Sequence, residues 1–340
     1  MQFAFWVANH SLQGQRSLED PMMILGNQLR ALGHDVVWDP SHREFAARES
    51  GINVLVEGFT PEIAEVVGQF HARGARFICV ATEEPTPTGF NHGRDGEMVR
   101  RQEAFPLAAR YFEAILHLVP GDHVTRWYAQ HAPAAYVELG YAPALVRGGD
   151  GREPEYDFGF FGSITRRRMR LLKRLARAIN TAKAVRIAGT FPTQEERDRI
   201  MREARVIVQL RKHEEMGLVS SSRCNTALCI GRPVVAEPHL LSEPWDRVVT
   251  FTSHCERCAE TPRTGREPPC DACVDRFVSA AIMTRAAWRG VHAAQFARFK
   301  ELLTPEYCVG RALREVGLDL GPATARAPQA REAAVEAVPA

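Results

Sequence analysis

Four cysteines in one short polar segment have the most specific chemistry in this 340-residue sequence. They form two pairs, Cys255-x2-Cys258 and Cys270-x2-Cys273, with eleven residues between the pairs. Two such pairs supply four thiolates at a spacing that suits a tetrahedral metal ion, and Zn²⁺ binds them at about 2.3 Å. The intervening residues have almost nothing apolar to bury, so we expect a metal to order them. The prediction is a closed, structural zinc site; an iron–sulfur centre and redox-active thiols are the alternatives.

Positively charged side chains gather in the second half of the chain, where expected helices and strands meet loops. Because the carboxyl ends of parallel strands lie at one edge of a sheet, these groups predict a site for a diphosphate. Glu237, at the end of a Pro-Val-Val strand, can accept a hydrogen bond from a ribose or sugar hydroxyl. The alternative is that the run 166–174 is a solvated helix face and Glu237 a surface acid. The candidate donor-site residues are Gly162, Ser163, Arg168, Arg211, Lys212, Arg223 and Glu237.

Acids and a histidine end several expected strands of the first half. His10 directly follows the first strand, and the ordinary pKa of histidine suits a general base that deprotonates an acceptor hydroxyl. Glu57 ends the third strand and Glu83-Glu84 the fourth, so these acids can also act as the base or bind the acceptor. Asn91-His92, in a glycine-flanked loop, is a further candidate acceptor contact. The simpler interpretation is a capping or solvent-facing histidine and ordinary surface acids.

An alternation of strands and helices must position these residues. In the first half we expect strands at 3–8, 35–38, 53–56, 76–81 and 114–119, with helices at 21–32, 61–73 and 98–112, the first opened by Pro21. After a glycine-rich linker at 146–154, strands at 156–161, 184–188, 205–210 and 233–236 alternate with helices at 166–180, 193–203 and 220–230. This rhythm predicts an α/β protein with two Rossmann-like, doubly wound parallel-sheet domains that hold the ligand between them.

The same pattern divides the chain into parts with different expected roles. Residues 1–148 form the predicted acceptor domain, and 155–253 the predicted nucleotide-sugar domain. The other parts are the cysteine insert at 254–276, C-terminal helices at 277–317, and an alanine-rich tail at 318–340 that we expect to be disordered.

The second half resembles the donor-binding domain of GT-B glycosyltransferases. The string Ser222-Arg-Cys-Asn-Thr-Ala-Leu-Cys-Ile-Gly-Arg-Pro-Val-Val-Ala-Glu237 is similar to that family's helix, glycine turn and Pro-Val-Val strand. Tyr156-Asp-Phe-Gly-Phe-Phe-Gly-Ser163 resembles the first strand and loop of the same domain. The pattern covers residues 156–250 and is similar to group 1 glycosyl transferases with CgeB-like members. The resemblance implies a GT-B fold and a nucleotide-sugar donor, and it adds Thr226, where the family commonly has a ribose-binding Glu, to the donor site.

Composition excludes several classes of function. The 43 Lys and Arg against 41 Asp and Glu give a net charge of +2, which argues against a nucleic-acid surface over the whole protein. No apolar run approaches the ~20 residues of a membrane span, and the N-terminus lacks a signal-peptide pattern, so we expect a cytoplasmic protein. GxGxxG does not follow the first strand, which argues against an NAD dehydrogenase; neither NAD nor PLP is expected as a cofactor.

The leading prediction is therefore a glycosyltransferase whose chemistry needs no metal and whose acceptor is a glycan, a protein or a nucleic acid. The first alternative is a non-catalytic binding protein of the same fold, whose zinc knuckle docks a partner or nucleic acid. A second is an epimerase acting on a UDP-sugar.

Overall fold

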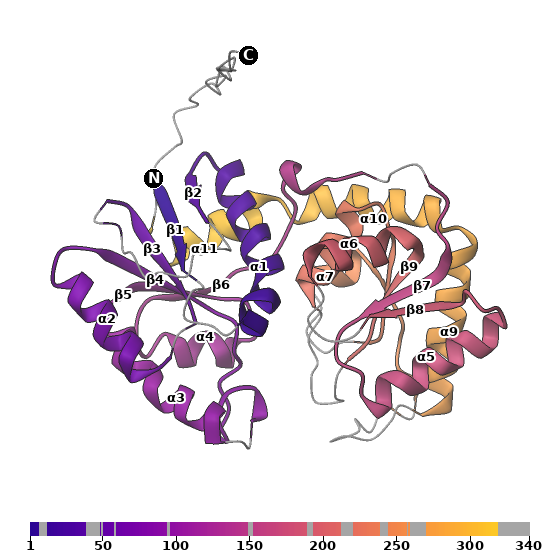
Figure 1. Cartoon of the computed structure of the whole chain (residues 1–340), viewed down its shortest axis with the longest axis horizontal. Coiled ribbons are helices and arrows are strands. Elements are labelled where there is room, and N and C mark those ends of the chain that lie inside the picture. Colours follow the sequence, from indigo (N-terminus) through magenta and orange to yellow (C-terminus); the bar gives the residue numbers. More distant parts are fainter. Residues whose placement is uncertain are drawn as a thin grey trace, which may run out of the picture.

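Two α/β halves lie side by side in the computed structural model (Figure 1). The structure describes residues 1–6, 12–38, 48, 50–57, 59–93, 96–148, 152–188, 193–211, 220–238, 244–256, 258 and 270–318. The tail after residue 318 and the segment 259–269 between the cysteine pairs lie outside these residues. Each half is built on a sheet whose strands run parallel. The predicted fold class, with two doubly wound parallel sheets, is confirmed.

The first sheet has the strand order β2-β1-β3-β4-β5-β6. Its strands are β1 (Gln2–Trp6), β2 (Asp35–Val37), β3 (Ile52–Val56), β4 (Arg76–Ala81), β5 (Phe112–His117) and β6 (Ala134–Tyr136). Alternate residues face opposite sides of the sheet: Phe3 packs in the cluster that contains α1, and Ala4 in the cluster on the other face. The helices are α1 (Leu12–Ala31), α2 (Pro61–His71), α3 (Gly96–Ala109) and α4 (Asp122–Tyr128), with a 3₁₀ turn η1 at Phe90–His92. Strand order reverses between β1 and β3, which is where such sheets bind ligands.

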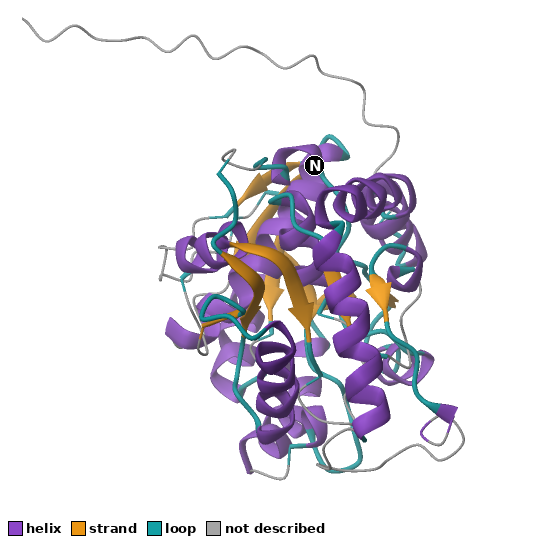
Figure 2. Cartoon of the chain, turned by 90° about the vertical axis from the view of Figure 1, so that its right-hand side faces the viewer, coloured by secondary structure: helices purple, strands orange, loops and turns teal. Residues whose placement is uncertain are grey.

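The second sheet has the order β11-β10-β9-β7-β8. Its strands are β7 (Tyr156–Phe161), β8 (Val185–Ala188), β9 (Ala204–Gln209), β10 (Val234–Ala236) and β11 (Thr250–Phe251). The helices between them are α5 (Arg166–Ile179), α6 (Gln194–Glu203) and α7 (Ser221–Cys229), with 3₁₀ turns η2 (Pro143–Leu145) and η3 (Trp245–Arg247). Seen from this half, helices surround the strands (Figure 2). Gly159 lets β7 approach β9, since a Cβ there would lie 2.9 Å from the side chains of Ala204 and Ile207.

The C-terminal helices connect the two halves. They are α9 (Asp271–Ala286), α10 (Trp288–Leu302), the π-helical turn η4 (Glu306–Gly310) and α11 (Arg311–Glu315). Helix α9 packs on the second sheet, and the chain then returns to the first half, where the Leu303 carbonyl accepts a hydrogen bond of 2.7 Å from the Tyr141 amide (Figure 1). Phe299 and Leu313 belong to the same apolar cluster as Phe3. One continuous core therefore extends through both halves.

Most predicted elements form within a few residues of their expected bounds, but the first helix does not. It begins at Leu12, so the expectation that Pro21 opens this helix is wrong. An internal proline removes one helical hydrogen bond and costs about 3 kcal/mol. Burial of Leu18 and ion pairs of Glu19 and Asp20 with the second half offset that cost. The expected C-terminal helices at 277–317 form, but the first of them, α9, already begins at Asp271, and Ala287 separates it from α10.

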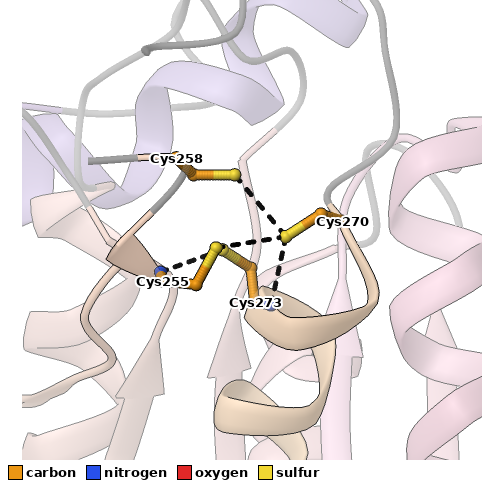
Figure 3. A group of neighbouring side chains, drawn as sticks. All are labelled: Cys255, Cys258, Cys270 and Cys273. Carbon is orange, nitrogen blue, oxygen red and sulfur yellow. Dashed lines mark hydrogen bonds between the residues drawn. The ribbon is translucent and has the colours of Figure 1, made fainter. Parts of the chain in front are cut away.

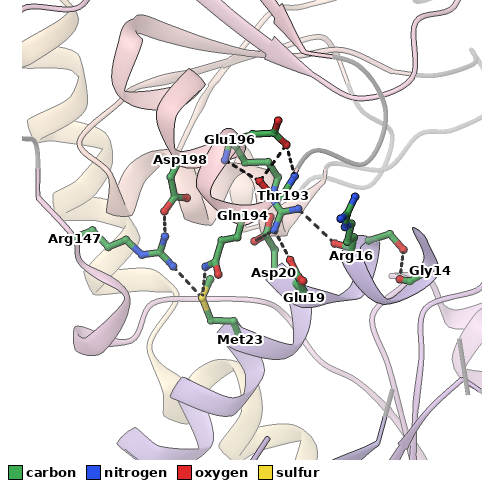
Figure 4. Close-up of polar contacts among 12 residues, drawn as sticks. Gly14, Arg16, Glu19, Asp20, Met23, Arg147, Thr193, Gln194, Glu196 and Asp198 are labelled. Carbon is green, nitrogen blue, oxygen red and sulfur yellow. Dashed lines mark hydrogen bonds and ion pairs between the residues drawn. The ribbon is translucent and has the colours of Figure 1, made fainter. Parts of the chain in front are cut away.

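Buried ion pairs join α1 to the second half (Figure 4). Arg197 of α6 donates from Nη2 to Asp20 Oδ1 at 2.9 Å and lies 3.3 Å from Glu19 Oε2. Arg147, in the connection between the halves, pairs with Asp198. Burial raises the pKa of Asp20, and the charge of Arg197 opposes that shift. Because removing one partner of a buried pair costs about 3–5 kcal/mol, these contacts hold the halves in one arrangement.

Candidate functional site

The carboxyl ends of β7, β9 and β10, which we call the second edge, contain a buried ion pair. Arg167 donates from Nη1 to Glu237 Oε2 at 2.6 Å and from Nη2 to Oε1 at 2.5 Å. The Arg211 amide donates to the same carboxylate at 2.8 Å. Glu237 therefore ties the start of α5 to the loop after β9. Its position at the end of the Pro-Val-Val strand agrees with the sequence, but both its oxygens bind protein groups.

Arg168 contacts both the loop after β7 and the loop after β9. These two loops lie where the strand order of the second sheet reverses. Its Nη2 donates to the Leu210 carbonyl at 2.8 Å, and its Nη1 donates to the Ser163 carbonyl at 2.9 Å and lies 3.1 Å from Ser163 Oγ. These partners fix the guanidinium but bring no negative charge. Burial, with the nearby charge of Arg223 adding to it, lowers the pKa of Arg168 to about 10. The group stays protonated at neutral pH and would gain from a bound anion.

Arg223 approaches the same loop from the start of α7. Its guanidinium lies 4.8 Å from the centre of the Phe161 ring and donates to the Gln209 side chain. Its Nε is buried without a hydrogen-bond partner among the described residues, and burial lowers its pKa to about 10. A buried charged donor without a partner costs free energy, and a hydrogen bond to an acceptor oxygen of a ligand would remove that cost.

Gly162 makes room for both guanidinium groups. Its φ of +132° lies in a region that L side chains rarely adopt. A Cβ there would lie 3.3 Å from Arg223 Nη2 and 3.5 Å from Arg168 Nη1. Among the described residues, no carboxylate lies within 4.0 Å of a nitrogen of either arginine. The second edge thus presents two converging cations that are available to an anion.

Two further predicted donor residues add little to this description. Lys212 lies outside the described residues. Thr226 is buried within α7, and its hydroxyl donates to the Ser222 carbonyl at 2.9 Å.

The carboxyl ends of β3 and β4, which we call the first edge, bring together two predicted acids. Arg101 of α3 lies between them, with Nη2 2.8 Å from Glu57 Oε2 and Nη1 2.9 Å from Glu83 Oε1. Asn91 donates a second hydrogen bond to the Glu83 carboxylate. Glu57, Asn91 and His92 all have left-handed backbone, with φ of 54° or 55°. Strained backbone of this kind persists where the surroundings enforce it and clusters at functional sites.

The acids of the first edge differ from exposed carboxyls in their proton affinity. Burial, together with the negative charge of Glu57, raises the pKa of Glu83 to about 7. Burial also raises the pKa of Glu57, against the attraction of Arg101. A carboxyl with a pKa near 7 is about half ionised at neutral pH, so it can take a proton from a hydroxyl. The other predicted base, His10, lies outside the described residues.

Helices of the two halves pack against each other. Helix α1 follows β1, α7 follows β9, and these helices are in contact. The Asn225 amide of α7 also donates to the Gly140 carbonyl of the first half at 2.5 Å. The negative charge of Asp20 in α1 acts on Arg223. These contacts bring α1 of the first half beside α7 and the second edge.

Sequence reasoning missed Arg101, the group that joins the acids. It lies inside a helix without any motif around it. The signal for its partners was stronger, because each acid directly follows an apolar strand.

The four cysteines of the insert form one cluster (Figure 3). Their Sγ atoms all lie within 4.8 Å of one another, with 3.4 Å between Cys255 and Cys270 and 3.5 Å between Cys258 and Cys270. Tetrahedral Zn–S bonds of about 2.3 Å place sulfurs roughly 3.8 Å apart, so this set fits zinc. Cys270 also caps α9, and its Sγ accepts the Cys273 amide at 3.4 Å. A metal here would anchor the start of α9, and no ligand position would be left for catalysis.

Within the part of the chain that the structure describes, no helix is both long and apolar enough to cross a bilayer.

Comparison with known proteins supports the fold. No family model and no curated protein matches the sequence. The solved structure of the DNA-modifying enzyme beta-glucosyltransferase, studied with and without uridine diphosphoglucose, matches 93% of this chain and 100% of its own, at 8% identity and a TM-score of 0.50. TarM (10% identity, 81% of this chain, TM-score 0.45) and the glycotransferase of kitacinnamycin (11%, 94%, 0.43) are less similar in structure. The chain spans 56% of the length of TarM and 98% of the kitacinnamycin enzyme. The chain thus has a GT-B-like fold of two Rossmann-like domains; the CgeB-like resemblance stays a prediction.

Proposed function

We propose that this protein is a glycosyltransferase that moves a sugar from a nucleotide-sugar donor to an acceptor hydroxyl. The observation that carries the proposal is the convergence of Arg168 and Arg223 over Gly162, at the point where strand order reverses. A diphosphate is the part of a nucleotide sugar that needs two cations and close backbone approach. The structural likeness to a glucosyltransferase supports this assignment at the level of the fold.

In this proposal the two edges act on opposite ends of the reaction. Glu83 takes the proton of the acceptor hydroxyl while the hydroxyl oxygen attacks the anomeric carbon of the donor. The bond from that carbon to the diphosphate oxygen breaks, and the electron pair leaves with the diphosphate. Arg168 and Arg223 stabilise the charge that develops on this leaving group. Such a single displacement inverts the anomeric carbon, and it needs no catalytic metal.

Arg101 and Arg167 would act as positioning residues. Arg101 orients the Glu83 carboxylate by an ion pair of 2.9 Å, and Glu57, on its other side, keeps the pKa of Glu83 high. Arg167 and Glu237 hold the loop after β9, which supplies the carbonyl groups that fix Arg168. The cysteine cluster is proposed as a structural zinc site that stabilises the second half.

Direct binding of the donor tests this function. Isothermal titration with UDP, GDP and their sugars should find one nucleotide that binds wild type, with affinity at least tenfold weaker in Arg168→Ala and Arg223→Ala. Arg199→Ala, an exposed arginine of α6, is the matched control and should bind like wild type. Release of free nucleotide from the bound sugar donor, slowed in Glu83→Gln, would separate an enzyme from a binding protein. Wild type that binds none of these nucleotides would refute the assignment.

A further inference from the structure

A basic groove follows α5 along the second half, beginning beside the second edge. Helix α5 and the start of α9 line it, and its volume is ≈ 640 Å³. Its basic residues recur at intervals of three or four, so they lie on one face of the helix. They are Arg166, Arg170, Lys173, Arg174 and Arg177.

The groove has an excess of positive charge. Arg170 pairs with Asp271 at 2.7 Å and Arg174 with Asp275 at 3.0 Å, both across to α9. Among the described residues, no carboxylate lies within 4.0 Å of a nitrogen of the other three basic residues, which are Arg166, Lys173 and Arg177. Three such cations on one face are notable in a chain whose net charge is +2. The positive charge is concentrated in this groove, so an anionic ligand would bind there rather than over the whole surface.

The shape of the groove restricts what that ligand is. The basic row runs from Arg166 to Arg177, eleven steps of roughly 1.5 Å or about 16 Å along the helix, so it suits a polymer with repeated charges. A concave groove can hold a strand of a linear polymer, whereas a flat bilayer contacts flat or convex protein surfaces better. Four of the five basic residues are arginines, whose planar donors match phosphate oxygens in pairs. Ile164, Met169 and Val274 also line the groove and offer apolar contacts beside the cations.

We propose that this groove binds the phosphodiester backbone of a nucleic acid. The cations follow the backbone, and they bind phosphates rather than base edges, so little sequence preference is expected. The cysteine cluster supports the groove, because Cys270 caps the helix that supplies its second wall. The proposal does not depend on sugar transfer, because it concerns a different face of α5 from the one that carries Arg168.

Fluorescence anisotropy with a labelled 20-base-pair duplex and a 20-nucleotide single strand, between 50 and 200 mM salt, tests the proposal. Binding by wild type should weaken steeply with salt. On a duplex, each phosphate that a cation neutralises adds about 0.9 to the steepness of log K against log salt, so Lys173→Gln with Arg177→Gln should reduce that steepness by about 2. The matched control is Arg73→Gln with Arg110→Gln, two exposed arginines of the first half, and it should keep the wild-type slope.

Several results would overturn this inference. They are the absence of salt-dependent binding to either nucleic acid, equal weakening in the control variant, and displacement by poly-glutamate at the same charge concentration, which would indicate an acidic protein partner. Vesicles containing 30% phosphatidylserine that bind when nucleic acid does not would indicate a membrane instead. Nucleotide-sugar titration on the same variants distinguishes this failure from failure of the transferase assignment, since Lys173 and Arg177 are not donor-site residues. Unchanged melting temperatures would show that both variants are folded.

Discussion

The two carboxyl edges of this molecule come from the same strand-and-helix rhythm but hold opposite charges. At the first edge, two carboxylates share the single guanidinium of Arg101. At the second edge, Glu237 is occupied by Arg167, which leaves the charges of Arg168 and Arg223 without a carboxylate among the described residues. A doubly wound sheet thus fixes where ligands bind, while the residues after each strand fix which ligand. One edge is suited to take a proton and the other to hold an anion.

The second half also contains the proposed zinc site, and loss of that metal should have the largest effect of these predictions. Cys255→Ser with Cys273→Ser should abolish a content of about one zinc per chain and destabilise the second half. Structural zinc sites in peptides contribute about 10–16 kcal/mol of apparent binding free energy. Elemental analysis and thermal melting check this. Cys229→Ala, which changes a core thiol, should keep the zinc; wild type without zinc would contradict the assignment.

Removal of the proposed base, Glu83, should have the next largest effect. Glu83→Gln keeps the shape and the Asn91 contact but cannot accept a proton, so kcat should fall by about 10²–10⁴-fold. Nucleotide affinity should not change if, as proposed, the donor binds the other edge. Glu84→Gln changes the adjacent acid, which contacts His123 at 3.1 Å, and should lower kcat less than tenfold. Equal decreases in both variants would remove Glu83 from the mechanism.

Removal of a cation at the second edge should give a somewhat smaller effect. Arg223→Ala should lower kcat/KM by about 10²–10³-fold, since it removes one group that stabilises developing charge. Steady-state kinetics measure this, with Arg199→Ala as the control. A change in nucleotide affinity alone, with kcat preserved, would limit Arg223 to ground-state binding.

The pH dependence should respond to Glu57 with the smallest change. The negative charge of Glu57 helps to raise the pKa of Glu83 to about 7. Glu57→Gln should therefore move the rising limb of kcat/KM from near pH 7 to lower pH, by on the order of one unit. A limb that stays in place or moves upward would exclude this coupling.

The same raised pKa predicts a stability effect with a defined sign. Between the ordinary value of 4.5 and about 7, the folded chain binds more protons at Glu83 than the unfolded chain does. The free energy of unfolding should then fall as pH rises through this window, and less so in Glu57→Gln. Urea unfolding at pH 5 and pH 7 measures the difference.

Much of this comparison could be predicted from the sequence, because strands end where apolar runs end. That rule located Glu57, Glu83, Arg211 and Glu237 at the edges. It could not predict that Arg101 joins two acids or that Arg167 occupies Glu237, since those contacts bring together residues 44 and 70 positions apart. Nor could it predict helix before Pro21, where ion pairs with the second half outweigh the local preference. Local patterns predict positions, whereas tertiary contacts decide partners.

The return of the last helices to the first half has a consequence for biosynthesis. Leu313 and Phe299 belong to the same core as Phe3. Residues that are synthesised first therefore cannot complete their packing until residues near the C-terminus have been synthesised. During most of elongation the N-terminal sheet would lack the C-terminal helices that complete its core, although N-terminal domains commonly fold before the rest of a chain is synthesised. Premature termination before residue 299 would then leave neither half with a complete interior.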